Sequence, residues 1–120
     1  MTQTDRRKYD RYNIVIDTEL STQSKASSSP FFVYTENVSR NGIMIWGKPD
    51  FYPFKNGSYL AVRLKIPDTD TVEFTGQVIH RSDGRFGIQI SQIDQINNTR
   101  YNKFISELES NSLKSVVNYG

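Results

Sequence analysis

Residues 58–66 read Ser-Tyr-Leu-Ala-Val-Arg-Leu-Lys-Ile, and apolar and polar side chains alternate along this stretch. Its arginine and lysine fall on one face, while the other face carries Leu60, Val62, Leu64 and Ile66. Successive side chains of a β-strand point to opposite faces, so a period of two indicates a half-buried strand. The stretch therefore predicts a fold whose core is covered by strands.

Five further segments have the composition or alternation of strands: Asn13 to Ser21, Phe31 to Val38, Ile43 to Trp46, Thr71 to Arg81, and Arg85 to Ile90. The last two are joined through Ser82-Asp83-Gly84, and Asp-Gly favours a tight hairpin because glycine accepts a positive φ. The second and third are separated by a turn over residues 39–42. Six mostly antiparallel strands, each with one apolar face, are best satisfied by a small barrel that buries those faces.

The hydrophobic period changes after the last strand. Apolar residues now recur with helical spacing at Tyr101, Phe104, Ile105 and Leu108. We expect an amphipathic helix that starts near Asp94 as its cap, ends by Asn111 and packs on the barrel. The chain is then one domain, with a flexible basic arm over 1–12, the barrel plus helix over 13–111 and a tail over 112–120.

Charge and composition limit the classes of function. Residues 1–12 hold four basic and two acidic residues and so carry the whole net charge of +2, because the rest of the chain holds 11 of each. Such an arm attracts an anion but is too small to wrap a long nucleic acid. The absence of cysteine excludes thiolate metal sites and cysteine nucleophiles. No stretch resembles a signal peptide or a membrane span, and we expect a cytoplasmic protein.

Two short motifs point to a nucleotide ligand. The first is Arg7-Lys8-Tyr9-Asp10-Arg11 in the arm, and the second is Asn37-Val38-Ser39-Arg40-Asn41-Gly42 at the predicted turn. Two arginines four residues apart project to the same side of a helical or an extended backbone. Each guanidinium can bind a phosphate, or the O6 and N7 atoms of a guanine, through two hydrogen bonds. The pair therefore suits a ligand that offers both groups.

The order of these motifs on this strand pattern resembles the PilZ domain, a family of bacterial receptors for cyclic di-GMP. The resemblance covers nearly the whole chain, and Gly76-Gln77-Val78 and Phe86-Gly87-Ile88 are similar to the family's closing hairpin. It implies a mainly β fold, namely a six-stranded antiparallel PilZ-type barrel with a C-terminal helix.

The resemblance also implies a role for each motif residue. Arg7 and Arg11 would bind the phosphates and guanine edges of cyclic di-GMP. Asn37 and Ser39 would contact a guanine, and Gly42 would permit the backbone turn. Asparagine at position 37 replaces the commoner aspartate and is a weaker acceptor for guanine N–H groups.

Arg6 and Arg40 are secondary candidates for the same ligand site. In proteins similar to this one, the position before the first arginine influences whether one ligand molecule or a stacked pair is bound. An arginine there could stack on a second guanine, so position 6 predicts binding of two ligand molecules.

The function implied by the resemblance is that of a receptor rather than an enzyme. The arm would close over the ligand, and an unidentified downstream protein would read the change. Stand-alone members of the family are linked to motility, attachment, exopolysaccharide export and virulence. We expect no catalytic residue, no metal and no cofactor beyond the ligand, since His80 is the only histidine and no carboxylate pair has a catalytic spacing.

Two other interpretations remain open at this stage. A small barrel with a basic arm could bind single-stranded nucleic acid, with Tyr9 and Tyr12 stacking on bases, although the balanced charge outside the arm argues against it. A nucleotide hydrolase is the other class, and no nucleophile and base stand at a suggestive spacing. Trp46, the single tryptophan, belongs either to the core or to a pocket wall, and we expect it in the core.

Overall fold

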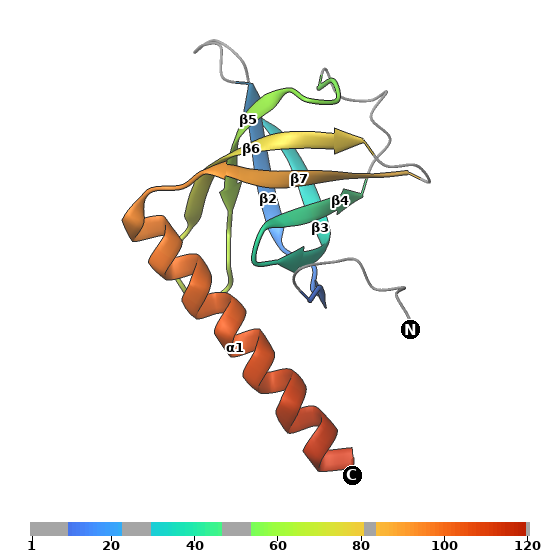
Figure 1. Cartoon of the computed structure of the whole chain (residues 1–120), viewed down its shortest axis with the longest axis vertical. Coiled ribbons are helices and arrows are strands. Elements are labelled where there is room, and N and C mark those ends of the chain that lie inside the picture. Colours follow the sequence, from blue (N-terminus) through green and yellow to red (C-terminus); the bar gives the residue numbers. More distant parts are fainter. Residues whose placement is uncertain (1–9, 23–29, 47–53, 81–83, 120) are drawn as a thin grey trace, which may run out of the picture.

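The chain folds into a small β-barrel with one long helix beside it (Figure 1). The structure is a computed structural model that describes residues 10–22, 30–46, 54–80 and 84–119. The six barrel strands are β2 (Asp17–Thr22), β3 (Phe31–Ser39), β4 (Gly42–Trp46), β5 (Tyr59–Leu64), β6 (Val72–His80) and β7 (Arg85–Gln92). They pair in the antiparallel order β3-β2-β5-β6-β7-β4, and pairing of β4 with β3 closes the ring. The predicted six-stranded barrel is confirmed.

The alternation predicted for β5 matches its burial. Its three aliphatic positions are buried and the positions between them are exposed. On the outer face, Arg63 pairs across the sheet with Glu19 of β2 and Glu73 of β6, at 3.7 and 3.0 Å. Because a shift of one residue would turn the aliphatic face outward, the buried face and these cross-strand pairs together fix the register.

The N-terminal strand is interrupted, which differs from the single strand predicted over residues 13–21. A two-residue strand, β1 (Tyr12–Asn13), pairs with the end of β3, and β2 begins only at Asp17. Between them, the Thr35 hydroxyl donates to the Ile14 carbonyl at 2.7 Å and accepts from the Ile16 amide at 2.9 Å. A buried side chain of β3 thus takes over part of the backbone pairing, and β1 becomes an extra strand outside the barrel ring.

The hairpin between β6 and β7 has the predicted antiparallel pairing. Gly84 has a φ of 76°, a conformation in which glycine carries no steric penalty. Ser82 and Asp83, the other residues of the predicted turn, lie outside the described residues.

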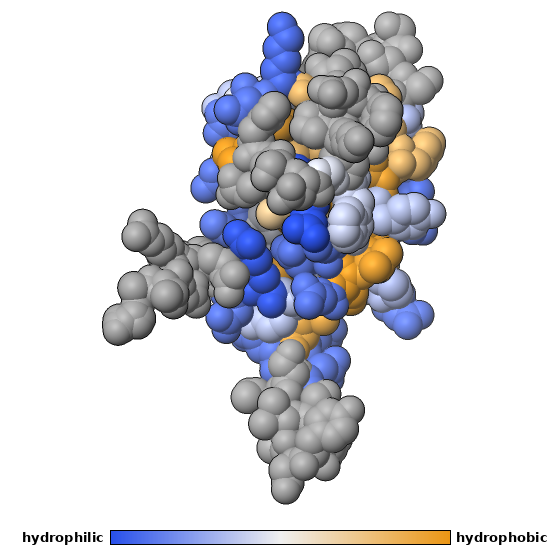
Figure 2. All heavy atoms as spheres, turned by 90° about the vertical axis from the view of Figure 1, so that its right-hand side faces the viewer, coloured by the Kyte–Doolittle hydropathy of each residue, from blue (hydrophilic) through white to orange (hydrophobic). Residues whose placement is uncertain are grey.

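Trp46 is on the surface, so the prediction that it belongs to the core is wrong. It is the last residue of β4 and is 48% exposed, with the Arg85 guanidinium 4.8 Å from its ring centre. Arg85 Nε also lies 2.8 Å from a carboxylate oxygen of Glu36, as an ion pair rather than an aligned hydrogen bond. The attraction between this cation and the ring stabilises the exposed tryptophan at the strand end. Figure 2 shows a face on which apolar side chains reach the surface among hydrophilic ones.

The helix α1 (Gln95–Tyr119) packs its apolar face on the barrel as predicted. Tyr101, Phe104 and Ile105 are buried, and the Tyr101 ring lies 6.3 Å from that of Phe74 in β6. Asp94 caps the helix, because its carboxylate accepts the backbone N–H of Asn97 at 2.8 Å. Hydrogen bonds from Asn97 to this carboxylate lower the pKa of Asp94.

The helix ends later than predicted. It continues to Tyr119 rather than stopping by Asn111, and its C-terminal half runs beyond the barrel (Figure 1). Residues 112–119 contain neither glycine nor proline, so the sequence has no helix stop before Gly120. Within the part of the chain that the structure describes, no helix has the length and apolarity needed to cross a membrane.

Candidate functional site

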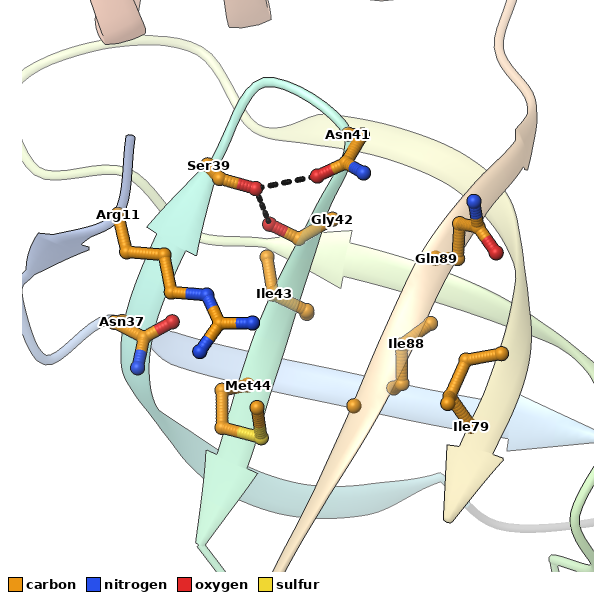
Figure 3. A pocket seen from close by; sticks show the side chains of 11 residues that line it. Arg11, Asn37, Ser39, Asn41, Gly42, Ile43, Met44, Ile79, Ile88 and Gln89 are labelled. Atoms are coloured by element: carbon orange, nitrogen blue, oxygen red, sulfur yellow. Dashed lines mark hydrogen bonds between the residues drawn. The ribbon is translucent and has the colours of Figure 1, made fainter. Parts of the chain in front are cut away.

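A cavity of about 200 Å³ lies where the β3–β4 turn meets β7 (Figure 3). Its polar lining includes Arg11, Asn37, Ser39, Asn41 and Gln89. Its apolar lining includes Ile43, Met44, Ile79 and Ile88. The cavity thus brings residues of β3, β4, β6 and β7 together with the residue that precedes β1.

Arg11 is the one residue of the first motif's arginine pair that the structure describes, and it reaches the second motif. β1 pairs Tyr12 with Val38 and Asn13 with Asn37, so the preceding residue stands beside the end of β3. Figure 3 shows the Arg11 side chain extending across the rim, with its guanidinium next to Asn37. Arg6 and Arg7 lie outside the described residues. Arg11 of the first motif and Asn37 and Ser39 of the second motif therefore line the same cavity.

Ser39 combines a rim position with a structural role in the turn. Its hydroxyl donates to the Asn41 side-chain carbonyl at 2.6 Å and lies 3.4 Å from the Gly42 carbonyl oxygen. Its own carbonyl accepts the hydroxyl of Tyr101 in α1, at 2.5 Å. Because the Ser39 proton is already used within the turn, the hydroxyl has only its oxygen to offer, as an acceptor.

Burial raises the pKa of Tyr101 well above the ordinary phenol value. The Tyr101 hydroxyl therefore remains a neutral hydrogen-bond donor to the turn over the whole physiological range. A buried, permanently protonated phenol is a constant support for the backbone of Ser39.

Gly42 is needed for a reason other than the one implied by the motif. Its φ is not positive, in contrast to Gly57 and Gly84. A Cβ atom at position 42 would lie 2.4 Å from the Ile88 carbonyl oxygen of β7. The expectation that glycine serves the conformation of the turn is therefore corrected, since it serves the close approach of β4 to β7.

Arg40 points away from the cavity, although it stands in the middle of the second motif. Its guanidinium reaches α1 and is 3.1 Å from a carboxylate oxygen of Glu109. It does not line the cavity, whereas its neighbours Ser39 and Asn41 do. Of the two secondary candidates, Arg40 is thus directed toward the helix and Arg6 is not described.

Asn41 and Gln89 line the cavity but were not singled out from the sequence. Asn41 follows Ser39 by two residues, and its carbonyl accepts the Ile90 amide at 2.8 Å. Because side chains two residues apart in an extended chain point to the same side, the position of Asn41 two residues after Ser39 could have identified it. Gln89 faces Gly42 because β4 pairs with β7, and no local pattern in the sequence shows the pairing of these distant strands.

A family model for the PilZ domain matches residues 5–107. The chain belongs to the PilZ domain family. Because the match includes both motifs, all of the barrel strands and the first half of the helix, the resemblance in the sequence is confirmed.

Solved structures share the fold of this PilZ domain at low sequence identity. Bacillus subtilis inhibitor of motility (MotI/DgrA) is 18% identical, with a TM-score of 0.72 over 92% of this chain. This chain spans only 54% of the MotI chain, about half its length. The PilZ domain of Escherichia coli YcgR, solved with c-di-GMP, is 16% identical, with a TM-score of 0.71, and covers 93% of this chain and 98% of its own.

A third similar structure is the PilZ domain of CeSA from a cellulose-synthesizing bacterium. It is 17% identical, with a TM-score of 0.65, and the match covers 83% of this chain and 98% of that one. A comparison with curated proteins finds no match. At these identities the solved structures establish the fold alone.

Proposed function

We propose that this PilZ domain is a receptor for cyclic di-GMP and has no enzymatic activity. One observation carries the proposal: a single cavity gathers the Arg11 guanidinium and the short uncharged side chains of Asn37, Ser39 and Asn41. A guanidinium recognises phosphate or a guanine edge, while amide and hydroxyl oxygens accept guanine N–H groups. The rim therefore offers both kinds of contact that a guanine dinucleotide requires.

The size of the cavity suggests how such a ligand would bind. At about 200 Å³ it is smaller than a usual ligand pocket, which measures roughly 300–1,000 Å³. It suits one guanine base, which Asn37 and Ser39 would contact. The phosphates and the second base would lie outside it, under Arg11 and Arg7, with Arg6 available to stack on a second ligand molecule.

The arm would act as the moving part of the receptor. Ligand binding would bring Arg7 over the barrel beside Arg11, and a partner protein would read the altered surface. Two similar proteins support this proposal: the YcgR domain was solved with c-di-GMP, and MotI is named an inhibitor of motility. We therefore infer a role in motility, attachment, exopolysaccharide or virulence control, exerted in the cytoplasm where this messenger acts.

Single-stranded nucleic-acid binding is not favoured. Cations on the barrel surface and on α1 already face carboxylates, in pairs formed by Arg63, Lys65, Arg85 and Arg100. Paired cations provide little of the counterion release that drives nucleic-acid binding. A continuous basic groove with aromatic platforms would be expected for that function.

Calorimetry of the purified protein tests the proposal. The titrants are cyclic di-GMP, cyclic di-AMP, GMP and a short oligonucleotide, all at physiological salt. We expect saturable heat with cyclic di-GMP and a stoichiometry of two ligands per chain. Saturable heat with the oligonucleotide and none with cyclic di-GMP would refute the receptor function.

A further inference from the structure

Arg40 connects the binding turn to the helix. Ser39 and Asn41 line the cavity, but the side chain between them bonds to three residues of α1. The three distances are 3.3, 3.4 and 3.1 Å, to Asn102, Ser106 and Glu109. These residues are spaced four and three apart, so they form one strip of the helix surface. One arginine therefore holds two turns of the helix against the back of the site.

The other half of the site reaches the same strip of helix. Tyr12 follows Arg11 directly in the chain and is one of the two residues of β1. Partial burial, and next the nearby Glu109 carboxylate, raise the pKa of the Tyr12 phenol. Glu109 thus pairs with Arg40 of the turn at 3.1 Å and is near enough to Tyr12 to influence its phenol.

We infer that Arg40 is a positioning residue that couples occupancy of the cavity to helix α1. The inference rests on the proposed function and adds the route by which binding leaves the site. A ligand that contacts Asn37 and Ser39 on one side and Arg11 on the other immobilises both the turn and β1. Arg40 then holds Asn102, Ser106 and Glu109 more firmly, so the ligand tightens α1 on the barrel.

Coupling of this kind is reciprocal, which makes it measurable from the helix side. If the ligand strengthens the contact of Arg40 with α1, loss of that contact must weaken the ligand by the same factor. A residue of the helix that never touches the ligand would then alter its affinity. If Arg40 instead contacted the ligand directly, a change at Glu109 of the helix would leave the ligand affinity unchanged.

A double-mutant cycle separates the two roles. The variants are Arg40→Ala, Glu109→Gln and the two combined, with cyclic di-GMP affinity measured by calorimetry. Each single change should weaken binding about 3- to 5-fold, since partly exposed ion pairs contribute little, and the double variant should be no weaker than Arg40→Ala. Glu107→Gln is the matched control, because this exposed glutamate lies on the same helix two residues away. It should leave the affinity unchanged.

Hydrogen exchange supplies a readout that a merely structural role would not change. In the wild-type protein, saturating cyclic di-GMP should slow amide exchange over residues 100–109, and in Arg40→Ala the bound ligand should no longer do so. Unchanged or faster exchange in the ligand-bound wild type overturns the coupling and leaves the receptor function intact. Weakened binding in Arg40→Ala with unchanged binding in Glu109→Gln also overturns it. Absence of cyclic di-GMP binding to the wild type refutes the receptor function itself.

Discussion

The two sides of the cavity rim are held in different ways. The β3–β4 turn is fastened from behind, because Tyr101 bonds to its backbone and Arg40 ties it to α1. The opposite side is β1, which consists of two paired residues. One side of the site is therefore fixed by the helix, whereas the other is held by a strand pairing of only two residues. Substitutions on the two sides should distinguish stability from binding.

Gly42→Ala should have the largest effect, and it should act on the side of the rim that the β3–β4 turn forms. The added Cβ would collide with the Ile88 carbonyl oxygen at 2.4 Å, so β4 or β7 must shift. We expect the free energy of unfolding to fall by about 3 kcal/mol in urea denaturation, together with loss of cyclic di-GMP binding. Gly87→Ala is the control, because a Cβ there meets nothing nearer than 3.8 Å. Equal stability of the two variants would contradict the need for glycine where β4 approaches β7.

Arg11→Ala should affect binding alone. Hydrogen bonds to charged groups contribute roughly 1.5–3 kcal/mol, so cyclic di-GMP affinity should fall about 10-fold or more. The unfolding free energy should stay within about 0.5 kcal/mol of the wild type, as for most surface changes. Arg63→Ala serves as the control, because its partners Glu19 and Glu73 lie on the outer face of the sheet. Unchanged calorimetric affinity in Arg11→Ala would remove the arm from the site.

Tyr101→Phe should produce a smaller loss of stability, on the same side of the rim as Gly42→Ala. It removes only the hydroxyl that bonds to the Ser39 carbonyl and keeps the buried ring. We expect a loss of about 1 kcal/mol in unfolding free energy, the usual contribution of a single hydrogen bond. Tyr59→Phe provides the comparison, because that residue is 49% exposed on β5. If both variants match the wild type in urea, the turn does not depend on the helix hydroxyl.

The barrel could be predicted from the sequence because its signals are local. Alternation in residues 58–66 and the Asp83-Gly84 turn signal each depend on neighbours within a few positions. The break between β1 and β2 could not be predicted in this way. It depends on Thr35, which bonds to Ile16 from 19 residues away. Trp46 was misplaced for the same reason, because its partner Arg85 belongs to a distant strand.

The site was predictable in part for a similar reason. Asn37 and Ser39 alternate onto one face of β3, and a period of two brings both to the cavity. The motif suggested Arg40 as a ligand contact. The sequence could not show that its side chain points to Glu109 instead, because that direction depends on where the helix packs. Gly42 was singled out from the motif as the glycine of the turn, but the space it leaves is needed by Ile88, 46 positions along the chain.

The position of the cavity at the junction of β4 and β7 has a consequence for folding. Gly42 and Gln89 face each other across this junction, so the lining is assembled only when β4 pairs with β7. Pairing of such distant segments carries a high loop-closure cost and is slow compared with hairpin formation. An incompletely closed chain therefore has no place for a nucleotide. Any ligand held there binds the finished barrel alone and shifts the folding equilibrium toward it.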